Sequence, residues 1–542
     1  MFVKSLQFAI VYSLGLFSIS TTNATISSFV SNEAFVSPGE TVDLSWTVVG
    51  DANSILLNNL NVTGQSGQTV TPSGQSNYKL NVTTTSNQTD EEEVTVFSLA
   101  EGEVIISEFQ ASNDSTLTDE DGDSSDWIEI HNPTSAVADL TDYYLTDDID
   151  DAQKWRFPAT TIEAGGYLVV FASSKDRAVS GSELHTNFSL SSGGEYLALV
   201  KPDGVRATEF SPEYPEVPSD ISYGYDSSEL GFRFFEQATP GSDNGVSFEG
   251  FVGEAEFSVE RGIYEVGFSL VLTSSTPDAV IRYTLDGTEP TATTGLIYGP
   301  GAITINETSV VRAFASKDGL LGTRIATHSY IFPADVVTQP EMRPEITEHP
   351  TYGPKVLESI ATVPTISLSF AGNDIDREEI PLSVEMLNFE SGSTQLNAGA
   401  ARFGSFNTDF AKRSFRLEFR SRYGPSRLEF PLFNNREYNI PAVESFDSLD
   451  VRAGNHDMVL RGAYMGNPFG DDSMIDMGHV APHGRFVNIY FNGEYRGMYH
   501  LRERWNAAML SDYLPGEEEE FDTINANTVS YTHLTLPTTP YV

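Results

Sequence analysis

Short segments in which apolar and polar residues alternate recur over the first 332 residues, and turn residues separate them. In residues 41–48, for example, Val42, Leu44, Trp46 and Val48 fall on one face of an extended strand, and Pro38-Gly39 supplies a turn before it. A period of two is typical of strands with one buried face, and short strands at regular spacing are typical of β-sandwiches. The pattern therefore predicts an all-β fold for this part of the chain.

The alternating segments fall into three groups, which we assign to separate domains. Residues 25–99 predict an Ig-like β-sandwich, residues 101–246 a second β-rich domain and residues 250–332 a third. The chain has 542 residues, which is long enough for several domains. Residues 333–358 contain five prolines and no clean periodicity, so we interpret them as a linker. A fourth domain is expected over residues 360–527.

The N-terminal residues predict export. Lys4 supplies a positive charge, residues 6–17 form an apolar run, and Thr22-Asn23-Ala24 offers small residues for cleavage. This order is typical of a secretory signal peptide, here residues 1–24, and a buried N-terminal helix is the alternative. No later apolar stretch is long enough to span a membrane. We therefore expect a secreted protein, in the periplasm, at the cell surface or in the medium, with no membrane span after cleavage.

The composition excludes several classes of function. Asp and Glu number 77 against 31 Lys and Arg, giving a formal net charge of -46, so general binding to nucleic acid is disfavoured. The chain has no cysteine, which excludes disulfides, zinc–thiolate sites, iron–sulfur clusters and cysteine nucleophiles.

An acidic loop in the second domain is a candidate metal site. Asp119, Asp121, Asp123 and Asp126 place carboxylates close together in the sequence. Hard oxygen ligands at alternate positions suit Ca²⁺, although the glycine is not where an EF-hand loop requires it. The alternative is a solvated acidic loop without a metal ion.

Basic residues concentrate in the C-terminal part, where residues 333–528 hold 17 of the 31 Lys and Arg. In the predicted strand over residues 412–420, the side chains of Phe415 and Leu417 share one face, and Lys412 and Arg416 share the other. Backbone N–H groups near Gly404, the charge of Lys412 and the guanidinium of Arg416 could together hold a polyphosphate. The alternatives are a solvated strand face and ion pairing with neighbouring carboxylates.

A β-hairpin is predicted around Asn492-Gly493, because this pair lies between two alternating runs. In the second strand Glu503 shares a face with Tyr495, Tyr499 and Leu501, which is the face we expect to be buried. A buried carboxylate needs a partner, and Lys412 would serve. A Glu at the strand end that is open to water is the alternative.

Two of the β-rich domains resemble known families. Residues 126–133, DWIEIHNP, are similar to the lamin tail domain, an Ig-like sandwich. Residues 283–290, YTLDGTEP, are similar to the fibronectin-like module at the C-terminus of chitobiases, which in that family is an accessory module and not the hydrolytic domain.

The C-terminal domain resembles the CotH kinase family. Residues 380–385, 402–404, 412–419, 446–454 and 492–504 follow the order of its motifs. The resemblance implies an atypical α+β protein-kinase-like fold that binds ATP with Mg²⁺ and transfers the γ-phosphate to Ser or Thr of a protein.

The resemblance also implies roles for single residues of this domain. Lys412 would contact the phosphates, and Glu503 would be the catalytic-site carboxylate that orients Lys412. Arg402, Arg416 and Arg452 would be secondary phosphate contacts.

The resemblance places the catalytic and metal-binding aspartates of the family downstream of the hairpin. Residues 529–542 contain no Asp, Glu, Lys or Arg and look like a translated sequencing adaptor, so we expect a truncated CotH domain that is inactive as it stands. Two hypotheses follow for the complete protein. It is a secreted kinase that its sandwich modules hold on a surface or matrix polymer, or a non-catalytic binding protein of the envelope or extracellular space.

Overall fold

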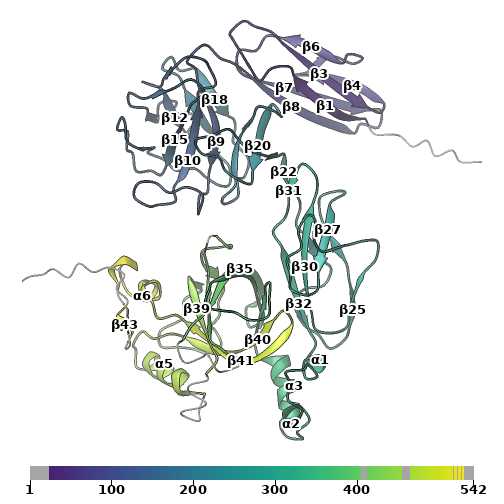
Figure 1. The fold of residues 1–542 in the computed structure, drawn as a ribbon, viewed down its shortest axis with the longest axis vertical. Coiled ribbons are helices and arrows are strands. Elements are labelled where there is room, and N and C mark those ends of the chain that lie inside the picture. Colours follow the sequence, from purple (N-terminus) through teal and green to yellow (C-terminus); the bar gives the residue numbers. More distant parts are fainter. Residues whose placement is uncertain are drawn as a thin grey trace, which may run out of the picture. The chain divides into compact units, whose positions relative to one another are not determined.

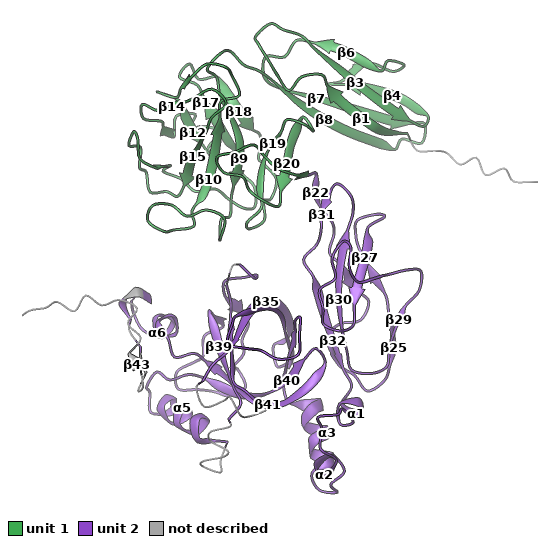
Figure 2. Cartoon of the chain, in the orientation of Figure 1, with its two compact units in different colours: residues 1–247 green, residues 248–542 purple. Residues whose placement is uncertain are grey.

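The computed structural model describes residues 24–404, 412–420, 422–454, 464–516, 518–521, 523–525 and 528–529. The predicted signal peptide and the predicted foreign segment therefore lie almost wholly outside the described residues. The chain divides into two compact units, residues 1–247 and residues 248–542 (Figure 2). Within the described ranges, we find no helix with the length and apolar character that a membrane crossing requires.

The first module of unit 1 is a β-sandwich, as predicted for residues 25–99 (Figure 1). Strand β3 buries Val42, Leu44 and Trp46, which confirms the face expected from the alternation. One sheet contains β1 (Thr25–Ser31), β3 (Val42–Val49) and β6 (Gly67–Val70). The other contains β2 (Phe35–Val36), β8 (Thr89–Ser98), β7 (Gly74–Thr84), β4 (Ala52–Leu57) and β5 (Leu60–Asn61).

The second module of unit 1 is also built from strands. Its larger sheet has the order β16 (Leu184–His185), β15 (Tyr167–Ala172), β10 (Asp126–His131), β9 (Ile105–Gln110), β19 (Ser222–Asp226), β20 (Gly231–Phe235) and β21 (Ser247–Phe248). Its second sheet has the order β13 (Trp155–Arg156), β12 (Tyr144–Thr146), β17 (Leu197–Val200) and β18 (Arg206–Phe210), and β11 (Ala138–Asp139) pairs with β14 (Thr161–Ile162). Trp127, Ile128 and Ile130 of β10 are fully buried.

Unit 2 begins with a third β-rich module. Its main sheet has the order β24 (Gly262–Ile263), β32 (Ala326–Ile331), β30 (Ser309–Ser316), β27 (Val280–Thr284) and β28 (Leu296–Ile297). Three two-stranded sheets complete it: β22 (Gly250–Phe251) with β31 (Leu320–Leu321), β23 (Glu256–Phe257) with β26 (Leu272–Thr273), and β25 (Phe268–Leu270) with β29 (Ile303–Ile305). Gly287, in the loop after β27, has a φ of 80°, which glycine adopts readily.

The segment that we interpreted as a linker is helical. It forms α1 (Pro333–Val336), α2 (Pro344–Thr347) and α3 (Gly353–Thr362). Val336 of α1 and Ile360 of α3 join a buried cluster with Leu387 and Tyr490, so these helices pack on the strands that follow them. A segment without periodicity folds here because proline favours the first turn of a helix, and each of the three helices has a proline as its first or second residue.

The C-terminal domain is centred on a closed barrel of strands (Figure 1). The order around the barrel is β33 (Thr365–Ser369), β34 (Ile380–Phe389), β35 (Gly392–Arg402), β36 (Phe415–Glu418), β39 (Ser448–Arg452), β41 (Glu494–Glu503) and β40 (Gly484–Phe491), and β40 returns to β33. The remaining elements are β37 (Leu428–Glu429), β38 (Ser445–Phe446), α5 (Gly466–Asp476), α6 (Ala507–Tyr513), the 3-10 helix η1 (Glu518–Glu520), β42 (Ile524–Asn525) and β43 (Thr528–Val529). The described part of this domain is thus mainly β, and the kinase-like α+β arrangement stays a prediction.

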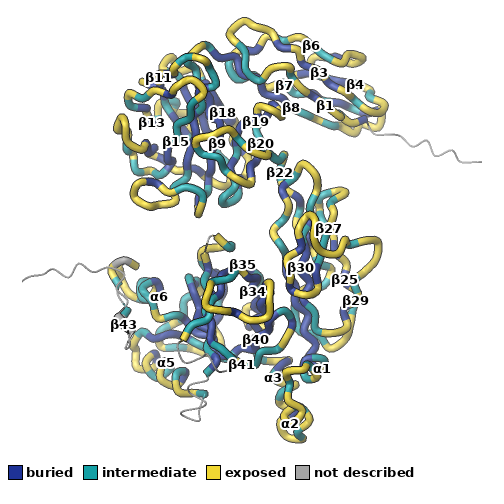
Figure 3. Tube along the Cα trace, viewed as in Figure 1, coloured by how far each residue is buried: buried dark blue, intermediate teal, exposed yellow. Residues whose placement is uncertain are grey.

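The barrel interior is the core of this domain, and Figure 3 shows its strands as largely buried. Phe415 and Leu417 of β36 point into it while Arg416 and Glu418 do not, as the alternation predicted. The predicted hairpin is confirmed: β40 and β41 pair antiparallel, and Asn492 and Gly493 both have positive φ between them.

Candidate functional site

A cavity of about 630 Å³ lies at one end of the barrel, where β40 ends and β41 begins. The same end receives the last residue of β35, Arg402, and the residues just before β36, Lys412 and Arg413. The helical linker also reaches the cavity through Glu341 and Met342. The other lining residues are Asn373, Asp374, Ile375, Ser414, Phe415, Phe491, Glu494, Tyr495, Arg496, Gly497 and Tyr499.

Lys412 is held against β41 by aromatic and backbone contacts. Its Nζ atom lies 4.3 Å from the ring centroid of Tyr499 and 5.1 Å from that of Tyr464, and it donates a hydrogen bond to the carbonyl oxygen of Met498. Cation–π contacts of this kind favour an ammonium at a partly desolvated site. Burial nevertheless lowers the pKa of Lys412 to about 8, so its charge is sensitive to pH just above neutrality.

Three guanidinium groups also line the cavity, and each has a carboxylate partner. Arg402 lies 3.1 Å from Asp376, Arg413 lies 2.9 Å from Asp374, and Arg496 lies 2.9 Å from Glu494. The carboxylates of these pairs are more than half exposed. Exposed ion pairs contribute little, so an anion with several oxygens can compete for these guanidinium groups.

The structure brings together two of the five predicted phosphate-contacting residues. Arg402 and Lys412 line the cavity, whereas Gly404, Arg416 and Arg452 are not among its described lining residues. Arg416 projects from the outside of β36, where its Nε donates to Asp450 at 2.9 Å and its guanidinium lies over the ring of Phe403. The alternation of faces that predicted Arg416 and Lys412 on the same side applies only within a strand. Lys412 lies before β36 begins, so the alternation does not fix its direction.

The predicted pairing of Glu503 with Lys412 is wrong. Glu503 is buried as expected, but its carboxylate accepts bonds from the backbone N–H of His483 at 2.7 Å and from the hydroxyl of Tyr513 at 2.6 Å. The ring Nδ1 of His483 lies 2.9 Å from the same carboxylate. Lys412 contacts Met498 and Tyr499 in the middle of β41, and Glu503 is the last residue of that strand, so several residues at a rise of about 3.3 Å each separate Glu503 from Lys412.

The described carboxylates of the cavity do not provide a site for Mg²⁺. Two of its described carboxylates, Asp374 and Glu494, already pair with Arg413 and Arg496, and Glu341 remains exposed at the rim. Mg²⁺ prefers oxygen ligands and octahedral geometry. The described lining residues therefore combine four basic groups with three carboxylates and do not form a Mg²⁺ site of their own.

The predicted Ca²⁺ loop holds an ammonium group at its centre. The Nζ atom of Lys175 lies 2.6 Å from Asp119, 2.8 Å from Asp121 and 2.8 Å from Asp123. Asp126 points elsewhere and accepts backbone bonds from Asn113 and Leu190. The acidic cluster thus exists, but Lys175 already supplies its cation and the four aspartates do not converge, so the described residues do not fit Ca²⁺ as they stand.

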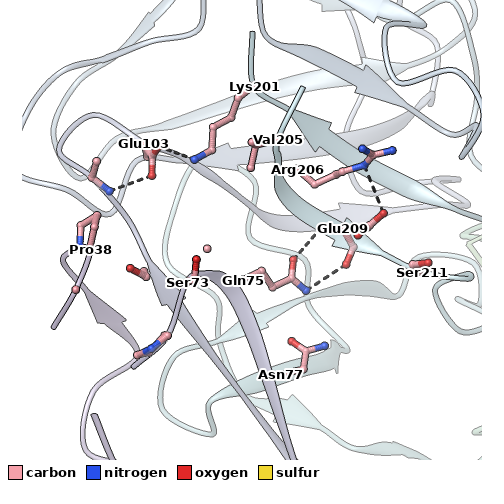
Figure 4. A pocket seen from close by; sticks show the side chains of 15 residues that line it. Pro38, Ser73, Gln75, Asn77, Glu103, Lys201, Val205, Arg206, Glu209 and Ser211 are labelled. Atoms are coloured by element: carbon pink, nitrogen blue, oxygen red, sulfur yellow. Dashed lines mark hydrogen bonds and ion pairs between the residues drawn. The ribbon is translucent and has the colours of Figure 1, made fainter. Parts of the chain in front are cut away.

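A second cavity of about 600 Å³ lies in unit 1 (Figure 4). Gln75 of β7 bonds with its side-chain amide to both the backbone N–H and the carbonyl of Glu209 in β18. Lys201 pairs with Glu103 at 2.5 Å in the same wall. These groups satisfy one another, so the second cavity offers fewer polar atoms to a ligand than the cavity at Lys412.

Sequence reasoning missed Arg413, Arg496 and Asp374 as lining residues of the cavity in unit 2. Arg496 lies in the second strand of the hairpin, shortly after the Asn492-Gly493 turn. An Asn-Gly pair marks the end of the sheet at which the two strands are joined. That signal could have assigned Arg496 to the same barrel end as Arg402. Asp374 lies in the loop between β33 and β34, and the position of this loop depends on how the barrel closes. No local sequence pattern predicts that closure.

Several solved structures are similar to this chain at low identity and low TM-score. The Bacteroides ovatus protein SGBP-B, solved with a mixed-linkage heptasaccharide, has 12% identity and a TM-score of 0.15, covering 57% of this chain and 71% of that one. The eight N-terminal Ig domains of Down Syndrome Cell Adhesion Molecule have 8% identity and a TM-score of 0.12, covering 73% and 52%. The BSP domain of a biofilm associated protein has 9% identity and a TM-score of 0.14, covering 77% and 95%. No curated protein matches the chain.

Three families match separate parts of the sequence. The Lamin Tail Domain family matches residues 98–213, and the chitobiase/beta-hexosaminidase C-terminal domain matches residues 259–327. The CotH kinase protein family matches residues 401–538, which includes the cavity residues Arg402, Lys412 and Tyr499. This match extends into the segment that we predicted to be foreign, and that assignment stays a prediction. The chain therefore carries a lamin tail domain, a chitobiase C-terminal-type module and a CotH-family domain.

Proposed function

We propose that the CotH-family domain binds the phosphates of ATP in the cavity at Lys412. The observation that carries the proposal is the gathering of Arg402, Lys412, Arg413 and Arg496 around one cavity of a chain whose net charge is -46. Exposed carboxylates offset the charges of Arg402, Arg413 and Arg496, so a polyanion would bind to Lys412 and to these guanidinium groups by displacing their partners. The size of the cavity, about 630 Å³, is in the range of small-ligand sites.

In this proposal the lysine and two of the arginines contact the phosphates in different ways. Lys412 meets the phosphates as a compact charge, and Arg402 and Arg413 bind phosphate oxygens with their planar guanidinium groups after releasing Asp376 and Asp374. Bound ATP would supply the phosphoryl group. In the complete domain, the γ-phosphate would pass to a Ser or Thr hydroxyl of a protein substrate; its bond to the β-phosphate would break, ADP would leave, and the hydroxyl proton would be released.

We place this activity outside the cytoplasm. The predicted signal peptide supports export, and the sandwich modules would hold the protein on a surface or matrix polymer.

Isothermal titration of the full chain with ATP tests the binding step. Wild type should bind, and Lys412→Ala should weaken binding by about ten- to hundred-fold, because a hydrogen bond to a charged group contributes about 1.5–3 kcal/mol. The matched control is Lys355→Ala, since Lys355 is exposed on α3 and does not line the cavity. Equal affinities for wild type and Lys412→Ala would refute the assignment of Lys412.

A non-catalytic binding protein is the second candidate function. It is favoured by the contacts of Glu503, since His483 and Tyr513 engage the carboxylate that the kinase interpretation assigns to Lys412. Assays of the complete domain with γ-labelled ATP and a mixture of proteins separate the two. Transfer of label to protein supports the kinase, and nucleotide binding without transfer supports the binding protein.

A further inference from the structure

A second cluster of metal-ligating side chains lies in the lamin tail domain, next to the Lys175 cluster. It consists of Glu120, Glu183 and His185, whose nearest ligand atoms all lie within 4.8 Å of one another. His185 is fully buried, and its Nε2 atom lies 2.9 Å from a carboxylate oxygen of Glu120. This set contains an imidazole nitrogen, unlike the aspartate loop, and so differs from that loop in the cation it prefers.

Each member of the cluster is oriented by a second contact that leaves a ligand atom directed at the others. The Nδ1 atom of His185 lies 2.8 Å from the hydroxyl of Ser173, so Nε2 is the atom that faces Glu120. Glu120 binds Arg177 through Oε1 at 2.8 Å and faces His185 through Oε2. Glu183 accepts the backbone N–H of Glu120 through Oε2 at 2.8 Å. Outer contacts of this kind orient the ligands in protein metal sites.

The backbone around His185 is fixed as well. Strand β16 pairs with β15 through Phe171 and His185, and His185 exchanges two backbone hydrogen bonds with Arg177 on its other side. The imidazole stacks on the ring of Phe171 at 5.3 Å. A ligand held this firmly loses little side-chain entropy on binding an ion.

The charges of the surrounding groups do not cancel. Glu120 and Glu183 are like charges in contact, and Asp119, Asp121 and Asp123 lie beside them. Lys175 is shared by the three aspartates, and Arg177 is shared by Glu120 and Asp121. Five carboxylates thus face two cations, which leaves an excess of negative charge for a divalent ion to offset.

We propose that Glu120, Glu183 and His185 bind a divalent transition-metal ion of the zinc type. One imidazole nitrogen and two carboxylate oxygens are a ligand set that Zn²⁺ accepts, and three protein ligands leave a fourth position for water or an external ligand. Arg177 keeps its bond to Oε1 of Glu120, so the ion does not have to displace it. This site is independent of the nucleotide proposal, because it lies in the other unit of the chain.

Titration of the full chain with Zn²⁺ alone, followed by calorimetry and thermal unfolding, tests the site. Wild type should bind Zn²⁺ and unfold at a higher temperature in its presence, because an ion that binds only the folded state stabilises it. Glu183→Gln should lower the affinity by at least about tenfold. Glu183 is exposed, so this isosteric change should leave the fold intact.

His185→Ala removes the nitrogen ligand and should abolish the Zn²⁺-dependent rise in unfolding temperature. His479→Ala is the matched control, because His479 is an exposed histidine in the other unit and its loss should leave that rise unchanged. Equal Zn²⁺ affinities for wild type and Glu183→Gln would overturn the proposal. So would a rise in unfolding temperature that His479→Ala abolishes and His185→Ala preserves.

Discussion

At the scale of single residues, the proposed binding of ATP depends on the charge of Lys412. Burial lowers the pKa of Lys412 to about 8, so the ammonium is present below this pH and lost above it. We therefore predict that ATP affinity is retained from about pH 6 to about pH 7.5 and falls as the pH rises through about 8. Calorimetric titrations over this range provide the measurement. Lys412→Ala should bind weakly and without this step, and an identical pH profile in that variant would assign the titration to another group.

Also at the residue scale, sequence patterns predicted the surroundings of single charged residues better than the residues with which they form hydrogen bonds or ion pairs. Burial of Glu503 followed from its face of β41, and Lys412 lines a cavity, although its role as a phosphate contact stays a prediction. The pairing of the two failed because sequence shows which face a side chain occupies but not which end of the barrel it reaches. Lys175 was not predicted as the cation of the aspartate loop, since more than 50 residues separate it from Asp119.

At the scale of elements, a buried carboxylate joins β34 of the barrel to β32 of the sandwich. Glu385 is fully buried and accepts bonds from both the backbone N–H and the hydroxyl of Ser329, and the Nε atom of Arg261 lies 3.7 Å away. Burial raises the pKa of Glu385 to about 7, although the charges of Arg261 and Arg312 oppose this rise. The folded state therefore binds a proton that the unfolded state has released above about pH 4.5.

The sign of this pH effect follows directly. Because the pKa of Glu385 is higher in the folded state, its contribution to stability is greatest below about pH 4.5 and is lost as the pH rises through about 7. We predict that the protection of β34 amides, corrected for intrinsic exchange rates, falls by about 1–3 kcal/mol between about pH 5 and about pH 8. Glu385→Gln should remove most of this dependence. A fall of the same size in Glu385→Gln would show that other groups cause it.

Whether an element could be predicted depended on whether its signal was local in the sequence. The β40–β41 hairpin and the buried faces of β3 and β36 were predictable, because strand alternation and an Asn-Gly turn are local signals. Helices α1 to α3 were missed because their prolines were interpreted as spacer residues, although proline at a helix start is itself a signal. Closure of the barrel by the parallel pairing of β33 with β40 is not local and left no pattern.

At the scale of the whole molecule, the CotH-family domain depends on segments that precede it in the chain. Gln339, between α1 and α2, donates to the carbonyl of Gly493 at 3.0 Å and accepts the N–H of Tyr495 at 2.9 Å. A side chain at Gly493 would also approach Val310 of the chitobiase-type module within 3.7 Å. The tip of the hairpin is thus held by the helical linker and lies close to the module before it, and the same hairpin carries Gly497 and Tyr499 into the cavity wall.

Because Gln339 holds the hairpin tip, we predict that a substitution at Gln339 weakens ATP binding although Gln339 does not contact Lys412. Gln339→Ala removes both hydrogen bonds to the hairpin tip, each contributing about 1 kcal/mol, so β41 should hold Tyr499 less firmly against the ammonium. We expect ATP affinity to fall several-fold while the pH at which it declines stays near 8. Gln237→Ala is the matched control, because Gln237 is exposed in the other unit. If Gln339→Ala binds ATP as wild type does while the hairpin amides lose protection, the wall of the cavity does not rely on the linker. The CotH-family domain would then be functionally separable from the module before it.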